Sequence, residues 1–317
     1  MKILANDGIS TAGSKMLTAA GYTVITDTVA QENLITYMNQ ENIEILIVRS
    51  ATKVRRETID ACPNLKMIAR GGVGMDNIDV EYGRSKGLKV VNTPASSSQS
   101  VAELVMGHMF ASARFLKDSY KNMESGDFKT LKKKYGKGME LRGKTLLIVG
   151  FGRIGQSLAS YALGCGMDVV AVDFTVYTVN VNVKIGTAME VDVPITTVTD
   201  LKTVLSNADF VSLHVPKQDD GSAVITMREI EMMKPTAIIV NAARGGVVDE
   251  EDLLDALNTG KLAGAAIDVF ENEPTPNKEL LSHPKIATTP HIGAATIEAQ
   301  DRIGEELANI VMTEYGG

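Results

Sequence analysis

Short apolar runs alternate with segments of helical length along nearly the whole chain. Each run has the length of a strand and few polar residues, as expected of a strand that is buried on both faces. Their alternation with helical segments predicts βαβ units and parallel sheets. The expected strands form a first series at residues 2–6, 22–26, 44–50, 65–70 and 88–94, and a second series at 145–150, 168–173, 209–215, 237–243, 262–270 and 285–290.

The segments between and after the two series have different patterns. Residues 100–120 show a long helical pattern that Ser100 is well placed to cap. Residues 122–144 are polar and rich in lysine, so we expect a loop or arm and the best candidate for a linker. The final helical pattern, at 296–315, is amphipathic and carries one apolar stripe of Ile303, Leu307, Ile310 and Val311.

Residues 174–199 do not fit this alternation. They are rich in β-branched residues and longer than most connections, and their strands cannot be placed from the sequence.

Length and composition limit the class of protein. A chain of 317 residues is too long for one ordinary core and suits two domains. With 44% hydrophobic and 22% charged residues it has the composition of a globular protein, and its net charge of 32 − 39 = −7 argues against a nucleic-acid partner. No apolar stretch approaches a membrane span, and the start is not a signal peptide. Cys62 and Cys165 give neither a disulfide framework nor a metal site. We expect a cytoplasmic protein without a metal.

A glycine motif follows the first strand of the second series. Gly150, Gly152 and Gly155 form GxGxxG between a buried strand and a helix. The first glycine allows a tight turn, the second lets the backbone approach a pyrophosphate, and the third lets the helix pack close to the sheet. The next strand ends at Asp173, whose carboxylate would accept hydrogen bonds from the adenosine ribose and repel a 2′-phosphate. Together these features predict NAD as cofactor.

Transfer of a hydride from an alcohol needs a base for the hydroxyl proton, and four histidines are available. His108 lies in an apolar helical pattern and is expected to be a packing residue, His214 ends a strand, and His283 lies in an expected surface turn. His291 follows a strand and a proline and precedes small residues that would admit a ligand. The pattern therefore favours His291 as the candidate base.

Two further charged groups could complete such a site. Glu271 and Glu273 both follow a buried strand, and a carboxylate that accepts a hydrogen bond from a histidine stabilises the imidazolium. Arg244, after another buried strand, could bind a substrate carboxylate through two parallel hydrogen bonds. The alternatives are solvated glutamates and a structural pair of Arg244 with Asp249 or Glu250.

The motifs "GFGRIG", "NAARGGVVDEEDL", "AAIDVFENEP" and "TPHIGAAT", in this order and spacing, resemble those of the D-isomer-specific 2-hydroxyacid dehydrogenases. The resemblance extends over essentially the whole chain. It implies a catalytic set of Arg244, Glu273 and His291, in which Glu273, next to Pro274, is preferred to Glu271. It also implies cofactor contacts from Val73, Gly150, Gly152, Arg153, Ile154, Gly155, Asp173, Val215, Ala242, Asp268, Gly293 and Ala294, with Asp268 beside the nicotinamide carboxamide.

The resemblance implies an α/β fold of two doubly wound parallel-sheet domains, in which a Rossmann NAD domain is inserted into a flavodoxin-like substrate domain. The substrate domain would comprise residues 1–98 and 293–317, and the NAD domain 99–292. The active site would lie in the cleft between the domains, closed by a hinge motion that excludes water. A homodimer is also implied, in which the arm around 120–140 reaches toward the partner.

Within the family, residues 48–94 look most like those of the 3-phosphoglycerate dehydrogenases. The glycine loop at 71–74 would offer backbone N–H groups to the substrate carboxylate. The substrate phosphate would need cations, for which the candidates are Arg49, Lys53, Arg70 and the run Lys132, Lys133 and Lys134, although this run has a solvated surface as its simpler explanation. The residues expected to bind substrate are Arg49, Ser50, Arg70, Gly72, Val73, Gly74, Arg244 and His291.

Two departures from the family pattern concern the adenine pocket. Phe174 replaces a common proline, and residues 215–226 lack the usual Leu-Thr pattern after the proline. The chain also stops at Gly317, without the regulatory domain of longer relatives, so we expect no inhibition by serine through such a domain.

The expected reaction is the NAD-dependent oxidation of D-3-phosphoglycerate to 3-phosphohydroxypyruvate, the first step of serine biosynthesis. The alternatives are a reductase of an unphosphorylated 2-oxoacid such as glyoxylate, hydroxypyruvate or pyruvate, and a non-catalytic NAD-sensing protein of the same fold.

Overall fold

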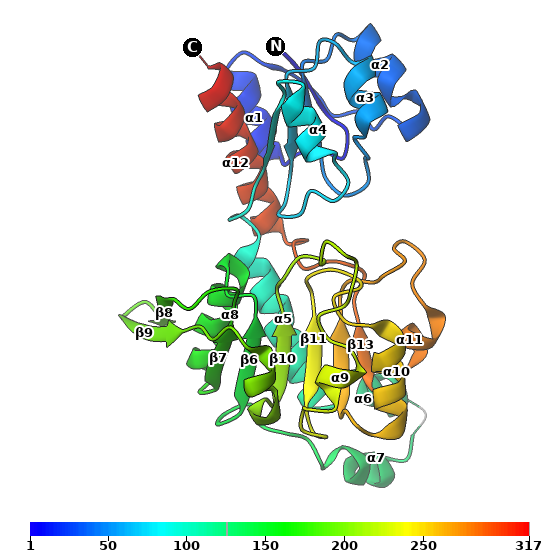
Figure 1. Ribbon diagram of the computed structural model, residues 1–317, viewed down its shortest axis with the longest axis vertical. Coiled ribbons are helices and arrows are strands. Elements are labelled where there is room, and N and C mark those ends of the chain that lie inside the picture. The colour runs from blue at the N-terminus through cyan, green and yellow to red at the C-terminus, as the bar shows by residue number, and fades with distance from the viewer. Residues whose placement is uncertain (125, 317) are drawn as a thin grey trace. The chain divides into compact units, whose positions relative to one another are not determined.

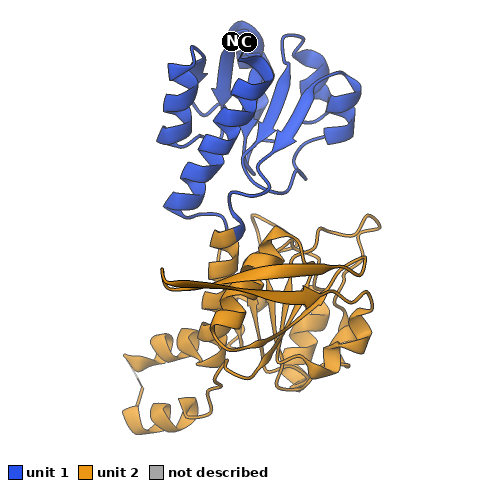
Figure 2. Ribbon diagram, turned by 90° about the vertical axis from the view of Figure 1, so that its left-hand side faces the viewer, with its two compact units in different colours: residues 1–98, 294–317 blue, residues 99–293 orange. Residues whose placement is uncertain are grey.

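The computed structural model describes residues 1–124 and 126–316, which form two compact units. Unit 1 comprises residues 1–98 and 294–317, and unit 2 comprises residues 99–293 (Figure 2). Each unit is an α/β structure built on a sheet of parallel strands (Figure 1). Within the described ranges, no helix combines the length and the apolar composition needed to cross a membrane.

The sheet of unit 1 has the strand order β2-β1-β3-β4-β5, and every neighbouring pair is parallel. This is the flavodoxin-like order, and it confirms the doubly wound fold expected for this part of the chain. The strands coincide with the five apolar runs of the first series; they are β1 Lys2–Ala5, β2 Thr23–Ile25, β3 Ile45–Val48, β4 Met67–Arg70 and β5 Lys89–Asn92.

Helices cover both faces of this sheet because its central strands are buried on both sides. One face packs against the first and last helices, and the apolar stripe of Ile303, Leu307 and Val311 points into that core as predicted. The other face packs against the three helices between them. The helices are α1 Thr11–Ala19, α2 Leu34–Gln40, α3 Arg56–Ala61, α4 Val80–Ser85 and α12 Ile297–Tyr315, with a 3-10 turn at Gln31–Asn33.

The sheet of unit 2 has the order β13-β12-β11-β10-β6-β7. This is the strand order of the Rossmann fold, except that the strand expected next to β7 is represented by a single parallel β-bridge between Val172 and Val198. The chain order reverses between β6 and β10, which is where such sheets bind dinucleotides. The strands match the second apolar series; they are β6 Thr145–Val149, β7 Asp168–Val172, β10 Phe210–Leu213, β11 Ile238–Asn241, β12 Gly264–Ile267 and β13 Ile286–Thr288.

Two helices, α5 and α8, pack on one face of this sheet, and α9, α10 and α11 pack on the other. Figure 1 shows these helices around the strands of unit 2. Their bounds are α5 Ser98–Ala113, α6 Leu116–Met123, α7 Phe128–Tyr135, α8 Arg153–Gly164, α9 Met227–Ile230, α10 Glu250–Thr259 and α11 Lys278–Ser282, with 3-10 turns at Leu201–Thr203 and Leu205–Asn207.

Three expectations about local structure need correction or completion. Ser100 does not cap α5, because the helix begins at Ser98 and the Ser100 hydroxyl donates instead to the Gly293 carbonyl at 2.7 Å. The lysine-rich segment is not a linker: it lies inside unit 2 and contains α7, which the buried side chain of Leu131 anchors. The segment after Asp173 forms an antiparallel hairpin of β8 Thr178–Ile185 and β9 Met189–Thr196.

Candidate functional site

The glycine motif lies between β6 and α8, at the point where the strand order of unit 2 reverses. Gly150 has a φ of +91°, and a Cβ there would lie 2.6 Å from the His214 carbonyl oxygen. A Cβ on Gly155 would lie 2.4 Å from the Gly150 carbonyl oxygen. Both positions therefore require glycine because of contacts within the protein.

The surroundings of Gly152 differ from those of Gly150 and Gly155. A Cβ added there would meet no protein atom within 4 Å, so packing alone does not explain this glycine. Gly152 is the N-cap of α8, and no side chain caps the helix. The first N–H groups of α8 thus remain available to a phosphate, with Arg153 and Ile154 as its first two residues. The residues of this loop fit the pyrophosphate of NAD.

Asp173 lies directly after β7, as expected for the residue that binds the adenosine ribose. Its carboxylate accepts hydrogen bonds from the Phe151 N–H at 2.9 Å, the Phe174 N–H at 2.7 Å and the Tyr177 hydroxyl at 2.7 Å. Burial raises the pKa of Asp173, but these three hydrogen bonds outweigh it, so the net pKa is lowered and the carboxylate is ionised at neutral pH.

His214 and Val215 follow β10, and Ala242 follows β11, so all three lie at the edge of the sheet that carries the glycine motif. His214 Nε2 lies 2.9 Å from the Ser212 hydroxyl. Burial lowers the pKa of His214 to about 4, so its ring is neutral under physiological conditions. A buried, neutral ring that contacts Ser212 has a structural role.

The three candidate catalytic residues follow three adjacent strands, because β11, β12 and β13 are neighbours in the sheet. Arg244 follows β11, Glu273 follows β12 and His291 follows β13. The carboxyl ends of parallel strands lie at one edge, which brings loops that are distant in sequence together. His291 Nδ1 lies 2.8 Å from a Glu273 carboxylate oxygen, and the other oxygen accepts the Phe270 N–H at 3.0 Å. Both side chains are partly exposed.

The backbone at His291 has an unusual conformation. His291 has a φ of 53°, in the left-handed region, which costs a residue other than glycine about 1–3 kcal/mol. Its N–H donates to the Asp268 carbonyl oxygen at 2.8 Å. The buried Asp268 carboxylate accepts the N–H groups of Ile292 and Gly293, both at 2.9 Å. Asp268 therefore fixes the loop that presents the His291 ring.

Two residues that the sequence did not single out for this site complete the network around Asp268. The Thr289 hydroxyl donates to the Asp268 carboxylate at 2.6 Å and lies 3.0 Å from His108 Nε2. Because the single Thr289 hydrogen points to the carboxylate, His108 is the donor in the second contact. His108 is buried, and burial lowers its pKa. The expected packing residue thus also supports the His291 loop, which its helical pattern could not reveal.

Arg244 lies in a tightly packed loop. Its Nη1 donates to the Ala243 carbonyl oxygen at 2.6 Å, and the Asn241 side chain donates to the Arg244 carbonyl oxygen at 2.9 Å. A Cβ on Gly245 would lie only 1.9 Å from the Phe270 carbonyl oxygen, so this loop touches the loop that leads to Glu273.

Asp249 and Glu250, which follow Arg244 in the sequence, both accept hydrogen bonds from backbone N–H groups. Asp249 caps α10 by accepting the N–H groups of Glu251 and Asp252. The Glu250 carboxylate accepts the Glu271 N–H at 2.8 Å. His283 lies at the C-terminal end of α11, on the surface turn expected from the sequence.

A cavity of about 450 Å³ adjoins the Glu273–His291 pair. Phe270, Pro274 and Pro290 contribute to its walls. The cavity gives a small molecule access to the imidazole. Among the described residues, no group of three or more histidines, cysteines, aspartates or glutamates is arranged to hold a metal ion.

The remaining candidate substrate residues belong to unit 1. Gly72, Val73 and Gly74 follow β4, and the Gly72 N–H donates to the Thr93 hydroxyl at 2.7 Å. A Cβ on Gly72, whose φ is +133°, would lie 2.0 Å from an Arg70 guanidinium nitrogen. Ser50 and Lys53 are exposed. Of the candidate cofactor residues, Val73 and Ala294 lie in unit 1 and the others lie in unit 2.

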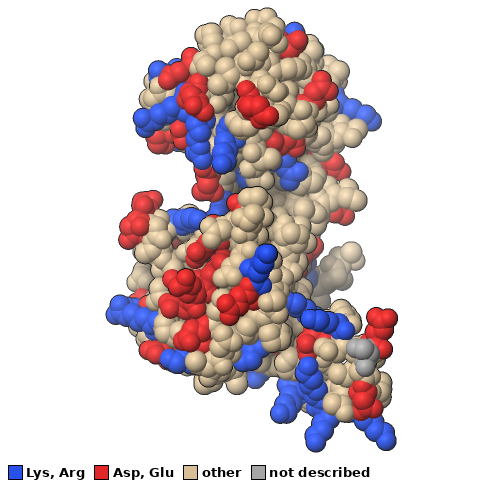
Figure 3. All heavy atoms as spheres, turned by 90° about the vertical axis from the view of Figure 1, so that its right-hand side faces the viewer, with Lys and Arg blue, Asp and Glu red and all other residues tan. Residues whose placement is uncertain are grey.

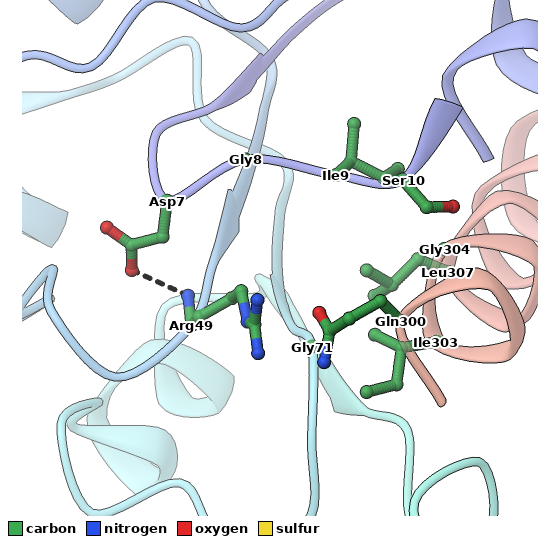
Figure 4. Close-up of a pocket in the computed structure, with 10 residues that line it drawn as sticks. All are labelled: Asp7, Gly8, Ile9, Ser10, Arg49, Gly71, Gln300, Ile303, Gly304 and Leu307. Carbon is green, nitrogen blue, oxygen red and sulfur yellow. Dashed lines mark hydrogen bonds between the residues drawn. The ribbon is translucent and has the colours of Figure 1, made fainter. Parts of the chain in front are cut away.

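Arg49 lines a cavity of about 230 Å³ in unit 1, together with Asp7, Ser10, Gly71 and Gln300. Figure 4 shows its side chain beside Gly71 and opposite Gln300. The Arg49 backbone N–H donates to the Asp7 carboxylate at 2.6 Å. Burial lowers the pKa of the guanidinium, which an anionic ligand would offset.

The lysine run of α7 lies on the surface. Basic side chains gather over α6 and α7 in Figure 3. Lys134 pairs with Asp118 at 2.5 Å, and Lys132 and Lys133 are exposed.

Comparison with known proteins agrees with these observations. Residues 106–293 match the family described as D-isomer specific 2-hydroxyacid dehydrogenase, NAD binding domain. This match covers most of unit 2 and assigns NAD binding to it.

Two curated relatives differ in their activities. The chain is 45% identical over 277 residues to a hydroxypyruvate reductase of Thermotoga maritima, covering 86% of this chain and 85% of that protein. It is 40% identical over 308 residues to a D-3-phosphoglycerate dehydrogenase of Methanocaldococcus jannaschii, covering 97% of this chain and 56% of that protein. The chain thus spans about half the length of the phosphoglycerate dehydrogenases that it matches.

Among solved structures, the TT0316 protein from Thermus thermophilus is similar, with a TM-score of 0.83 and 29% identity. The comparison covers 100% of this chain and 97% of that protein, so the similarity includes both units.

Proposed function

Because the chain belongs to the D-isomer-specific 2-hydroxyacid dehydrogenase family, we propose that it oxidises D-3-phosphoglycerate to 3-phosphohydroxypyruvate with NAD. This would be the entry step of serine synthesis. The substrate carries two anionic groups, a carboxylate and a phosphate, and therefore needs two cationic sites. The observation that carries the proposal is the Arg49 guanidinium, which lines a cavity of unit 1.

The surroundings of Arg49 support a role in binding an anion. Across the described residues, its guanidinium makes no hydrogen bond and no ion pair, although it is partly buried in a cavity. Burial lowers the pKa of the guanidinium more than the nearby Asp7 carboxylate raises it, so the charge is only partly compensated, and a phosphate would add charge-assisted hydrogen bonds. The Gln300 amide and the Ser10 hydroxyl, which line the same cavity, can also donate to phosphate oxygens.

The residues of unit 2 would perform the proton transfer. We propose that Arg244 binds the carboxylate and that His291 Nε2 accepts the C2 hydroxyl proton, while Nδ1 keeps its contact with Glu273. The Glu273 carboxylate stabilises the imidazolium that forms, because a hydrogen bond between charged groups is stronger than one between neutral groups. The Asp268 network holds the loop in the conformation in which the ring reaches the substrate. NAD, when bound to the glycine loop of unit 2, supplies the acceptor for the C2 hydride.

A reductase of hydroxypyruvate is the second candidate. It is favoured by the 45% identity to the Thermotoga maritima hydroxypyruvate reductase, of which the chain covers 85%. Such an enzyme would use the same residues of unit 2 but would not need the Arg49 guanidinium.

Substrate preference in the Arg49→Gln variant separates these candidates. We expect kcat/KM of the unmodified protein to be far higher for D-3-phosphoglycerate than for D-glycerate. Arg49→Gln should lower the value for D-3-phosphoglycerate by about 10- to 100-fold, since hydrogen bonds to charged groups contribute about 1.5–3 kcal/mol, and leave that for D-glycerate nearly unchanged. Arg55→Gln is the matched control, because Arg55 pairs with Asp79 away from this cavity.

Two results would redirect the assignment. Equal efficiency with D-3-phosphoglycerate and D-glycerate, with hydroxypyruvate reduced best, would replace the first candidate by the second. A protein that binds NADH but reduces none of these substrates would instead be a sensor of the dinucleotide.

We also propose that the protein acts as a homodimer through α5, α6 and α7. Large apolar side chains are exposed on and around these helices, and soluble monomers rarely expose such a set without a partner. They are Phe110, Phe115, Tyr120, Met123 and Phe128, exposed by 44%, 38%, 72%, 50% and 67%.

A further inference from the structure

The hydroxyl of Tyr177 lies against the carboxylate that is expected to bind the cofactor ribose. It is 2.7 Å from Asp173 Oδ2 and 3.1 Å from the Phe151 carbonyl oxygen, inside the glycine motif. Tyr177 therefore joins the two segments that form the adenosine end of a Rossmann site, the glycine loop and the end of the second strand.

The acceptor positions of Asp173 are largely occupied by the protein itself. A carboxylate has about four such positions. Asp173 Oδ2 accepts from the Phe151 N–H and the Tyr177 hydroxyl, and Oδ1 accepts from the Phe174 N–H. One position remains, on Oδ1, for a ribose hydroxyl. Only one acceptor position of the Asp173 carboxylate is therefore available to a ligand.

The base of the β8–β9 hairpin holds Tyr177 in place. The Tyr177 N–H donates to the Thr197 hydroxyl at 3.0 Å, and the Thr197 N–H donates to the Tyr177 carbonyl oxygen at 3.0 Å. Thr197 is 1% exposed, so these two hydrogen bonds are shielded from water. Burial and the Asp173 carboxylate raise the pKa of Tyr177 to about 12, so the hydroxyl keeps its proton and remains a donor.

We propose that Tyr177 is a second determinant of cofactor selectivity, which acts with Asp173 to favour NAD(H) over NADP(H). A 2′-phosphate would have to lie within a few ångströms of the Asp173 carboxylate, where the Tyr177 hydroxyl already lies. Asp173 excludes it by charge, and the Tyr177 hydroxyl blocks the Oδ2 side of the carboxylate, which leaves room for a ribose hydroxyl at Oδ1 but not for a phosphate. Either residue alone maintains the selectivity, so a change of preference requires both substitutions.

Binding of the two reduced cofactors to four proteins tests this proposal: the unmodified protein, Asp173→Ser, Tyr177→Ala and the double variant. The dissociation constants of NADH and NADPH are measured by titration of cofactor fluorescence, without any substrate. Asp173→Ser should weaken NADH by about 10- to 100-fold, the range of a hydrogen bond to a charged group, with less than about threefold gain for NADPH. The double variant should bind NADPH at least about tenfold more tightly than Asp173→Ser does.

Two further variants make the result specific. Tyr177→Phe keeps the ring and removes the hydroxyl, so combined with Asp173→Ser it should gain NADPH affinity without disturbing the packing of the hairpin. Val176→Ala, at a residue beside Tyr177 that is 66% exposed, should leave both dissociation constants unchanged. If Asp173→Ser alone binds NADPH as tightly as both double variants, Tyr177 has no part in selectivity. Because no substrate is used, this outcome is independent of the proposed reaction.

Discussion

The contact between His291 and Glu273 concerns two partly exposed side chains that are 18 positions apart in the chain. A surface ion pair of this kind contributes little to stability, about 0–1 kcal/mol. The pair is instead important for catalysis, because the Glu273 carboxylate stabilises the positive charge that the His291 imidazole gains when it accepts a proton. The left-handed backbone at His291 agrees with this view, since strain of this kind concentrates at functional sites.

Substitutions of these two residues should affect turnover without affecting cofactor binding. His291→Ala removes the proposed base and should lower kcat by about 10²- to 10⁴-fold. Glu273→Gln keeps the size and the hydrogen-bond acceptor but removes the charge, and should lower kcat by roughly 10- to 100-fold. Steady-state kinetics measures the loss, and fluorescence titration should show an unchanged dissociation constant for NADH.

The matched control is Glu271→Gln, on the same loop, where the backbone N–H and not the side chain contacts Glu250. It should turn over at close to the normal rate. Undiminished turnover in His291→Ala, or equal losses in both glutamate variants, would show that the pair is not catalytic.

At the scale of elements, the packing of α1 on α12 depends on glycine. A Cβ on Gly13 would lie 2.4 Å from the Gly304 carbonyl oxygen, and a Cβ on Gly304 would lie 2.2 Å from the Ser10 hydroxyl. Neither contact can be relieved by rotation of a long side chain, because backbone or capping atoms are involved. The first and last helices of unit 1 are therefore joined at a distance that only glycine permits.

Gly13→Ala should accordingly destabilise the protein, although alanine is the better helix former. Forcing the two helices apart should cost roughly 1–3 kcal/mol, which urea unfolding followed by circular dichroism can measure. Gly107→Ala, inside α5 with no atom within 4 Å of the added Cβ, should be neutral or stabilising by up to ~1 kcal/mol. Similar stabilities for the two variants would mean that the helices adjust without cost.

At the scale of the whole molecule, the exposed apolar residues of α5, α6 and α7 should determine the state of association. Sedimentation velocity should give a mass of twice the 34.0 kDa of one chain. Phe128→Glu, at a residue that is 67% exposed, should shift the population toward the monomer, because a buried unpaired carboxylate is costly. Ile185→Glu, on the β8–β9 hairpin, should leave the mass unchanged. A monomer before any substitution would contradict the proposed dimer.

Much of the fold was predictable because it depends on local patterns. The eleven strands of the two parallel sheets coincide with apolar runs of the sequence, since a strand that is buried on both faces must be apolar throughout. The glycine motif was equally predictable, because its spacing between a buried strand and a helix is a local pattern, although the contact that requires glycine at position 150 comes from His214 after β10. The resemblance to the family was confirmed by the match of residues 106–293.

Other features were not predictable because they depend on the tertiary structure. The helix α7 is polar and short, and the burial of Leu131, which anchors it, depends on packing that the local pattern does not record. The β8–β9 hairpin has no partner in the main sheets, so neither periodicity nor spacing revealed its pairing.

The sequence by itself determined the strands, the class of fold and the dinucleotide motif, because each rests on a pattern within a short stretch of chain. Only the tertiary structure decided which distant side chains meet. His108, Thr289 and Asp268 come from a helix and two loops, and Tyr177 reaches Asp173 from the base of a hairpin. The physical reason is that a hydrogen bond depends on distances of a few tenths of an ångström, which the packing of whole elements sets and no local pattern records.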